Sequence, residues 1–130
     1  MEREDVIDNI RKTEIAKSPI HGYGLFATEP IEAEEILGYL DGQKVPAKIH
    51  RKYDLCYEWN ALDDSMYLLR PYRTKYSYIN HSRTPNLLLE YSPLRVVATK
   101  DIPPGEELTL DYRKEPLPQE YLQGHGRTYL

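Results

Sequence analysis

Short apolar segments, each followed by a turn, recur along most of this chain. Residues 13–17 alternate polar and apolar side chains (Thr-Glu-Ile-Ala-Lys), which is typical of a strand with one buried face. Further short runs of leucine, valine and aromatic residues lie between turns that contain Gly, Pro, Asp or Ser. The pattern predicts strands over residues 13–17, 36–40, 56–59, 66–69, 87–91, 95–99 and 107–110. Many short strands with frequent turns indicate a mostly-β fold with little helix, in one domain.

Signals for helices are few. Val6, Ile7 and Ile10 lie at helical spacing among charged residues, so residues 1–12 form either a short N-terminal helix or a loose arm. Residues 46–53 are compatible with a second short helix. The tail, residues 114–130, contains proline and glycine and is expected to wrap around the domain as irregular structure.

Composition narrows the class of protein. Of the 130 residues 40% are hydrophobic and 29% are charged, which indicates a folded, soluble domain. No apolar run is long enough for a membrane span, and the charged N-terminus lacks the apolar stretch of a signal peptide. Cys56 is the single cysteine, which excludes an internal disulfide and a cysteine-clustered zinc site. An intracellular, reducing compartment is therefore expected.

The charge balance bears on possible partners. A net charge of −4 and a pI near 5.6 argue against direct nucleic-acid binding, which depends on neutralising phosphates. An acidic surface instead favours a basic partner, such as a lysine-rich peptide. Twelve tyrosines accompany a single Phe and a single Trp, and tyrosine suits narrow sites that need one polar contact.

Familiar catalytic arrangements are absent from the sequence. His81 and Ser82 are neighbours on an extended chain, so their side chains point to opposite faces and cannot form a nucleophile–base pair. No Gly-x-Ser-x-Gly elbow occurs. The four histidines are scattered without the spacing of metal ligands, and we expect no metal.

Three separated runs remain as candidates for function. Residues 22–24 (Gly-Tyr-Gly) allow either a positive φ or close approach of the backbone to a ligand, and they also suit a plain glycine hairpin. Residues 80–86 are Asn-His-Ser-Arg-Thr-Pro-Asn, and residues 107–112 are Glu-Leu-Thr-Leu-Asp-Tyr. The Asn and Ser side chains of the second run could alternatively serve as turn formers around the proline.

With these runs in this order, residues 13–113 resemble the SET-domain family of protein lysine methyltransferases. The resemblance implies a fold of several small sheets with a pseudoknot-like threading of the last motif, and S-adenosyl-L-methionine as cofactor. It implies that the substrate lysine enters through a narrow channel from the opposite face. By the same resemblance, Tyr112 stands at the methyl-transfer site and Asp111 is structural. The cofactor-binding residues are expected to be Gly22, Tyr23, Gly24, Asn80 and His81.

The sequence departs from the family pattern in the expected substrate channel. Many members carry a Tyr-x-Gly after the second strand, and alignment on Gly42 places Leu40 at the tyrosine position, with Tyr39 one residue early. A one-residue offset reverses the face of a strand, so Tyr39 cannot be assumed to substitute. Leu110 stands where the family often has Phe or Tyr. The channel residues that we expect are Leu40, Tyr57, Tyr78 and Leu110.

The whole chain, residues 1–130, is thus predicted to be one SET domain with a core over 13–113. The cysteine-rich zinc segment that often follows the last motif is absent, and residues 114–130, with Tyr121 or Tyr129 over the adenine, are expected to replace it as a lid. The expected partner is a lysine-containing protein or peptide, with histone tails as one candidate. Homodimerisation would cover exposed strand edges. The alternatives are a module that binds cofactor or peptide without turnover and, less favoured, a methyltransferase for a small molecule or a free amino group.

Overall fold

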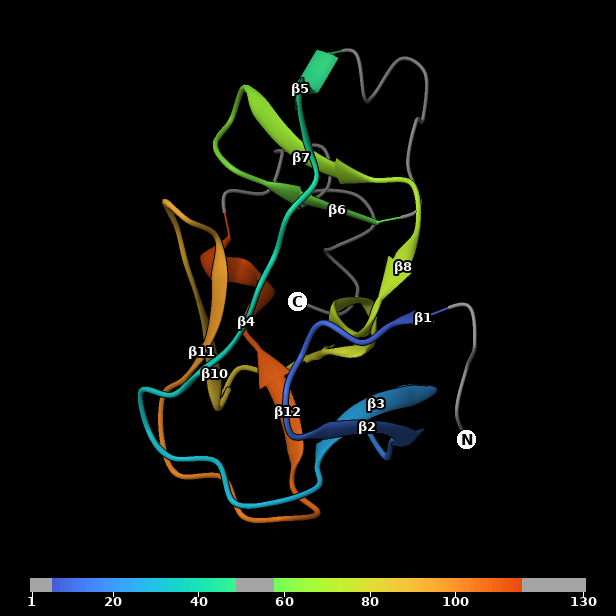
Figure 1. Cartoon of the computed structure of the whole chain (residues 1–130), viewed down its shortest axis with the longest axis vertical. Coiled ribbons are helices and arrows are strands. Elements are labelled where there is room, and N and C mark those ends of the chain that lie inside the picture. The colour runs from blue at the N-terminus through green and yellow to red at the C-terminus, as the bar shows by residue number, and fades with distance from the viewer. Residues whose placement is uncertain (1–5, 49–57, 116–130) are drawn as a thin grey trace.

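The computed structural model describes residues 6–48 and 58–115, and most of their regular secondary structure consists of short strands (Figure 1). The strands are β1 (Val6–Ile7), β2 (Thr13–Lys17), β3 (Tyr23–Ala27), β4 (Ile36–Tyr39), β5 (Gln43–Pro46), β6 (Glu58–Ala61), β7 (Met66–Arg70), β8 (Arg73–Thr74), β9 (Asn80–His81), β10 (Leu87–Glu90), β11 (Arg95–Ala98) and β12 (Glu107–Leu110). Two 3₁₀ turns, η1 (Lys75–Tyr78) and η2 (Tyr112–Lys114), complete the described elements. The predicted mostly-β fold of several small sheets is confirmed.

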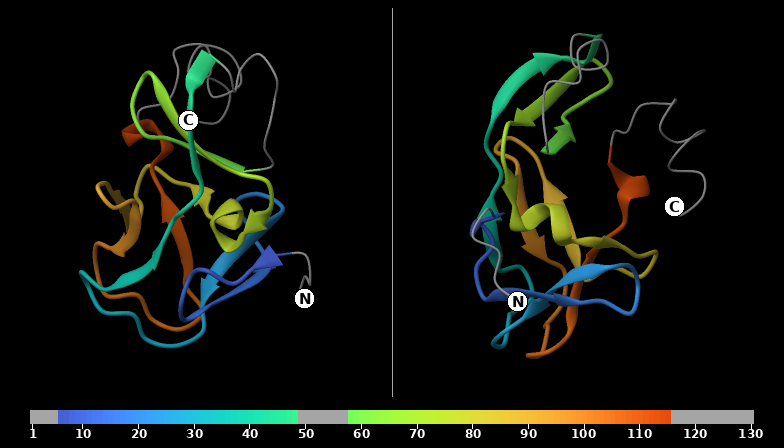
Figure 2. Two further views of the ribbon diagram at one scale, coloured as in Figure 1. Left: turned by 45° about the horizontal axis from the view of Figure 1, so that its top comes forward. Right: turned by 90° about the vertical axis from the view of Figure 1, so that its right-hand side faces the viewer.

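Four small sheets make up the architecture. Their strand orders are β2-β3-β12-β9, β10-β11-β4, β5-β7-β6 and β1-β8. The β5-β7-β6 sheet lies at one end of the molecule and the β2-β3 hairpin at the other, and both views of Figure 2 agree on this. Strand β12 runs through the middle, so the last predicted motif occupies the centre of the fold.

The central position of β12 follows from its pairing on both sides. It is antiparallel to β3, with Leu108 opposite Leu25, and parallel to β9, with Thr109 opposite Asn80. Parallel neighbours require a crossover connection, and here the β10–β11 hairpin supplies it. The strand is nearly continuous in its burial, since Leu108, Thr109 and Leu110 are all inaccessible to solvent.

The main hydrophobic core forms where these sheets meet. Its fully buried members include Leu25, Leu37, Leu87, Val96 and Leu108, which come from five different strands. A second, smaller core lies within the β5-β7-β6 sheet and consists of Ala47, Ala61, Tyr67 and Leu69. There the ring of Trp59 stacks on Tyr67 with centroids 4.9 Å apart.

Most predicted strands match the structure, whereas the two predicted helices agree with it less well. The alternating pattern at 13–17 and the motif at 107–110 coincide with β2 and β12. Val6 and Ile7 form a strand that pairs with β8, so a helix does not extend over these two residues. Ala47 and Lys48 adopt helical backbone, and the rest of the expected helix at 46–53 lies outside the described residues. In the described part of the chain, no helix is long and apolar enough to cross a membrane.

Candidate functional site

The side chain of Asn80 joins the turn after β2 to the central strand. Its Nδ2 group lies 2.9 Å from Oε2 of Glu107 and 3.2 Å from Oγ of Ser18. The same group lies 3.2 and 3.3 Å from the carbonyl oxygens of His21 and Tyr23. All three predicted runs, the glycine run, the Asn-His-Ser run and the run at 107–112, therefore meet at this amide.

Ser18 shapes the turn that carries the glycine run. Its backbone N–H donates to the carbonyl of Gly22 at 2.8 Å, and its hydroxyl oxygen accepts from the N–H of Ile20 at 3.0 Å. The hydroxyl donates to the Glu107 carboxylate, 2.8 Å from Oε1. These bonds close the turn and tie it to β12.

The two glycines of the run serve different purposes. Gly22 has a φ of +45°, a left-handed conformation that costs other residues about 1–2 kcal/mol. A Cβ added to Gly24 would lie 2.3 Å from Oε2 of Glu107, so Gly24 leaves space for that carboxylate. The positive φ that the sequence allowed is therefore found at Gly22. The close approach at Gly24 is to a protein side chain, and approach of this run to a ligand stays a prediction.

His81 and Tyr112 lie against each other at the end of β12. The backbone N–H of Tyr112 donates to Nδ1 of His81 at 3.1 Å, and the ring centroids are 5.3 Å apart. Because Nδ1 accepts this bond, the proton of the neutral imidazole belongs on Nε2. The parallel pairing of Leu110 with His81 brings the two rings together.

The hydroxyl of Tyr112 has a defined orientation, since it donates to the backbone carbonyl of Ile79. Asp111 caps the turn η2 that begins with Tyr112: its Oδ1 accepts from the Arg113 N–H at 3.0 Å, and its Oδ2 accepts from the Arg113 guanidinium at 2.7 Å. Those bonds to Arg113 lower the pKa of Asp111 to about 2. A permanently charged cap thus fixes the backbone that presents Tyr112.

Asn86, the last residue of the Asn-His-Ser run, bonds directly to the backbone of β12. It is 5% exposed, its Oδ1 accepts from the Thr109 N–H at 2.8 Å, and its Nδ2 lies 2.9 Å from the Glu107 carbonyl. Neither bond is a local turn contact, because the partners lie more than twenty residues away in sequence. Asn86 therefore locks the second motif onto the third.

The residues expected in the substrate channel are mostly core residues. Leu40, Tyr78 and Leu110 are buried in the main hydrophobic core, and Tyr57 lies outside the described residues. Leu40 is 5% exposed whereas Tyr39 is 55% exposed, so the two lie on opposite sides of the chain, as the one-residue offset requires. The roles proposed for these residues in a channel stay predictions.

A small cavity of about 20 Å³ lies beside Leu110 and is lined also by Tyr91, Asp111 and Glu115. Its size corresponds to about one water molecule.

The carboxylate of Glu115 accepts a hydrogen bond from the hydroxyl of Tyr76 at 3.3 Å. Burial raises the pKa of Glu115 to about 7.

Sequence reasoning did not single out Ser18 or the side chain of Glu107, and both lie at the centre of the site. In the sequence, Ser18 only precedes a proline in the turn after residues 13–17, and Glu107 is one position of a motif. The available signal was the glycine two residues after Gly22, which indicates that something approaches closely there. No group of three potential metal ligands clusters within residues 6–48 and 58–115.

Comparison with known proteins shows the family to which this chain belongs. The family model described as "SET domain" matches residues 22–113, about 70% of the chain. Relatives include Histone-lysine N-methyltransferase trithorax of Drosophila virilis (33% identity over 76% of this chain), Histone-lysine N-methyltransferase set-2 of Caenorhabditis elegans (32% over 75%) and Histone-lysine N-methyltransferase SETD1B of Homo sapiens (33% over 79%). The chain belongs to the SET-domain family.

A solved structure extends the agreement to three dimensions. A chain of the humanized mutant of the Chaetomium thermophilum Polycomb Repressive Complex 2, bound to the inhibitor GSK126, superposes with a TM-score of 0.62 at 26% identity over 79% of this chain. The match covers 15% of that chain, and this chain spans only 3%, 8% and 6% of the three relatives. Family membership and fold thus rest on one domain shared with much longer proteins.

Proposed function

We propose that this protein transfers a methyl group from S-adenosylmethionine to the side-chain amine of a lysine in a protein substrate. The observation that carries the proposal is the hydroxyl of Tyr112, which donates to the carbonyl of Ile79 immediately before Asn80 and His81. A hydroxyl that donates its proton in this way can act toward a further group only as an acceptor. It is suited to accept an N–H of an incoming amine.

The residues present fit the amino-acid end of S-adenosylmethionine. Asn80 directs its Nδ2 group into the protein, and its Oδ1 atom accepts no hydrogen bond from any described residue. An amide oxygen in this state suits an ammonium group. The turn at Gly22, Tyr23 and Gly24 adjoins it and would hold the same end of the cofactor, with His81 on the adenine side. When bound, the cofactor supplies a methyl group on a positively charged sulfur.

The chain's own contribution to the reaction is position and proton state. A lysine amine has an ordinary pKa near 10.4 and attacks only after it loses its proton. Burial of the amine beside a cation favours that neutral form. Acceptance of one N–H by Tyr112 leaves the nitrogen lone pair free and directed toward the methyl. Fixing two reactants in line can lower a barrier by roughly 7–11 kcal/mol.

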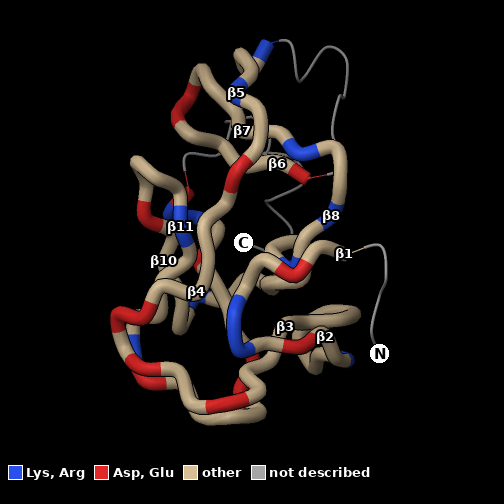
Figure 3. Tube along the Cα trace, in the orientation of Figure 1, with Lys and Arg blue, Asp and Glu red and all other residues tan. Residues whose placement is uncertain are grey.

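A basic protein segment is the substrate class that we favour, and histone tails are one candidate. Acidic residues are frequent in the loops that precede β4 and β12, over residues 29–35 and 101–106 (Figure 3). The two loops lie side by side, since Ile31 and Ile102 form an isolated β-bridge. The curated relatives named above are called histone-lysine methyltransferases, which also favours a lysine in a basic segment. Such a reaction would take place inside the cell.

The test is transfer of labelled methyl from S-adenosylmethionine to a mixture of basic proteins, with the label located by mass spectrometry. We expect label on lysine, and we expect Tyr112→Phe to keep its fold while its rate falls about 100-fold or more. Tyr72→Phe is the matched control, because Tyr72 is 37% exposed and should tolerate loss of its hydroxyl. Turnover of Tyr112→Phe at the wild-type rate would contradict the proposed role of Tyr112.

The second candidate is a module that binds cofactor or peptide without turnover. Leu40 favours it, because this position brings no hydroxyl and its side chain packs in the core. Binding of S-adenosylmethionine by the wild-type protein without transfer to any basic protein would support the module. Label on an amine that is not a lysine would instead support a small-molecule enzyme.

Leu110 leads to an expectation about the product. It brings neither a hydroxyl nor a ring to the position between Thr109 and Asp111, so its own side chain offers no group to hold a water against the lysine amine. We therefore expect more than one methyl group per lysine. Mass spectrometry that finds only monomethyl-lysine after long incubation would count against this expectation.

A further inference from the structure

Glu107 is a carboxylate that the proposed reaction does not use, yet it lies at the centre of the candidate site. It begins β12 and faces the turn after β2, where both of its oxygens lie within 2.9 Å of the Ser18 hydroxyl. Its Oε2 also accepts from the Asn80 amide at 2.9 Å. None of the ion pairs between described residues includes Glu107, so its partners are neutral donors.

The backbone has adapted to this carboxylate. At Gly24 a Cβ would lie 2.3 Å from Oε2 and 2.9 Å from Cδ of Glu107. Gly24 sits within the regular strand β3 and needs no left-handed conformation, so the absence of a side chain there serves the carboxylate. A side chain at position 24 would require the Glu107 carboxylate to move, so the glycine allows the carboxylate its present placement.

The Glu107 carboxylate is the nearest of three acceptors that determine which way the Asn80 amide points. An ionised carboxylate and a backbone carbonyl only accept hydrogen bonds. Glu107, His21 and Tyr23 all present such oxygens to the same side of Asn80. The amide must therefore direct its NH₂ group inward, and its Oδ1 faces away from these three acceptors.

We infer that Glu107 is a positioning residue, which holds the Asn80 side-chain oxygen outward as a preformed acceptor for the ammonium group of the bound cofactor. The inference rests on the proposed function for the identity of the ligand. Glu107 touches neither cofactor nor substrate in this scheme and acts through Asn80 and the Ser18 turn. The acceptor is oriented before binding, so no bond has to be broken when the ligand arrives.

The test compares Glu107→Gln with the wild-type protein by isothermal titration calorimetry. An amide at this position presents an NH₂ group, which competes with that of Asn80 and allows the Asn80 amide to turn over. We expect S-adenosylmethionine to bind about 10-fold or more weakly, which is the usual range for a lost hydrogen bond to a charged group. Glu107→Asp keeps an acceptor-only side chain and should retain part of the affinity.

A second ligand separates positioning from a general loss of structure. 5′-Methylthioadenosine lacks the amino-acid end of the cofactor, so its affinity should be the same for Glu107→Gln and wild type. Glu14→Gln is the matched control, since Glu14 is exposed in the same sheet and makes the same change of charge. Equal affinity of Glu107→Gln and wild type for S-adenosylmethionine, or an equal loss for both ligands, overturns the inference.

The two proposals fail in different ways. If wild type binds S-adenosylmethionine and Glu107→Gln binds it weakly, but no lysine is methylated, the function is wrong and the positioning role stands. If Glu107→Gln binds the cofactor like wild type while lysine is methylated, only the positioning role is wrong. Absence of cofactor binding by the wild-type protein overturns both.

Discussion

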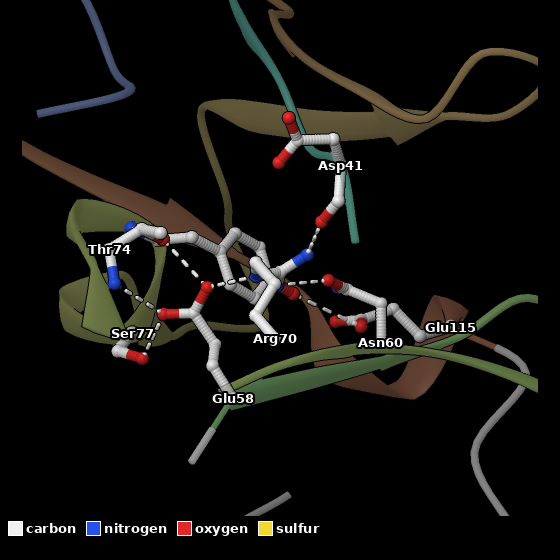
Figure 4. A network of polar contacts seen from close by, with 8 residues as sticks. Asp41, Glu58, Asn60, Arg70, Thr74, Ser77 and Glu115 are labelled. Carbon is white, nitrogen blue, oxygen red and sulfur yellow. Dashed lines mark hydrogen bonds and ion pairs between the residues drawn. The ribbon is translucent and has the colours of Figure 1, made fainter. Parts of the chain in front are cut away.

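Two carboxylates, Glu58 and Glu107, each collect several hydrogen bonds, but their surroundings differ. Glu58 is 4% exposed and accepts from Arg70, Thr74 and Ser77 (Figure 4). Its partner Arg70 is wholly buried and also donates to the carbonyl of Asp41 and to Asn60. Glu107 lies at the half-buried edge of the candidate site and has only neutral donors around it.

This difference in surroundings indicates different roles: the Glu58 network stabilises the fold, whereas the Glu107 network orients a side chain of the candidate site. The Glu58 network pairs a buried anion with a buried cation and joins β6 and β7 to the turn η1, so its bonds are directed inward. The Glu107 network ends at the Oδ1 atom of Asn80, which accepts nothing from the described residues. Loss of the first should therefore act on stability, and loss of the second on binding.

The largest expected effect comes from breaking the Glu58 network. Arg70→Met removes the cation and leaves Glu58 buried without its charge partner, which typically costs about 3–5 kcal/mol in free energy of unfolding. Urea denaturation of the wild-type protein and of Arg70→Met measures this loss of stability.

Arg95→Met is the control for Arg70→Met. Arg95 pairs with Glu90 at 2.7 Å, but both side chains are at least 33% exposed, so its loss should change the free energy of unfolding little. If the two variants lose the same stability, the buried pair does not hold the fold in the way described.

A smaller loss of stability is expected from substitutions at Gly24, where the Glu107 network contacts the backbone of β3. Gly24→Ala places a Cβ against the Glu107 carboxylate and should cost about 1–3 kcal/mol through forced displacement of neighbours. In a Glu107→Ala background the same substitution should cost less than half as much, since only the contact with Ser18 Cβ at 3.0 Å remains tight. A double-mutant cycle by thermal unfolding measures the coupling.

Gly22→Ala is the control for the double-mutant cycle of Gly24 and Glu107, because its added Cβ would have no atom within 4 Å. Its cost is the strain of a φ of +45°, about 1–2 kcal/mol, and that cost should be the same in both backgrounds. If Gly24→Ala also lowers the free energy of unfolding by the same amount in the wild-type and Glu107→Ala backgrounds, the glycine is not needed to make room for the Glu107 carboxylate.

The sequence predicted the strands and motifs of this fold well, but it could not predict the two carboxylate networks. Alternation at 13–17 and the motif at 107–110 mark β2 and β12 because local pattern and tertiary burial agree there. Glu106 and Glu107 are adjacent and identical, and only the pairing of β12 with β3 decides which one faces Ser18. Likewise, Glu58 and Arg70 meet because β6 and β7 pair in that register.

A third carboxylate, Glu115, lies between these two cases and gives the smallest predicted effect. Among the described residues its donor is the neutral hydroxyl of Tyr76, and burial raises its pKa to about 7 from an ordinary 4.5. The folded protein thus keeps this proton up to about pH 7, whereas the unfolded chain loses it near pH 4.5. The contribution of Glu115 to stability is therefore most favourable below pH 4.5, declines as the pH rises to 7, and changes little above that.

Glu115→Gln should abolish that decline while it keeps an oxygen for the Tyr76 hydroxyl. We expect the variant to gain about 1–2 kcal/mol relative to wild type between pH 4.5 and pH 8, after allowance for partial exposure. Urea denaturation of both proteins at several pH values measures the difference, and subtraction removes the titration of groups common to both. A constant difference across this range would mean that Glu115 is ionised in the folded protein at pH 5, like an ordinary surface carboxylate. Glu115 would then belong with exposed charges such as Glu90, and only Glu58 and Glu107 would remain as carboxylates shaped by the fold.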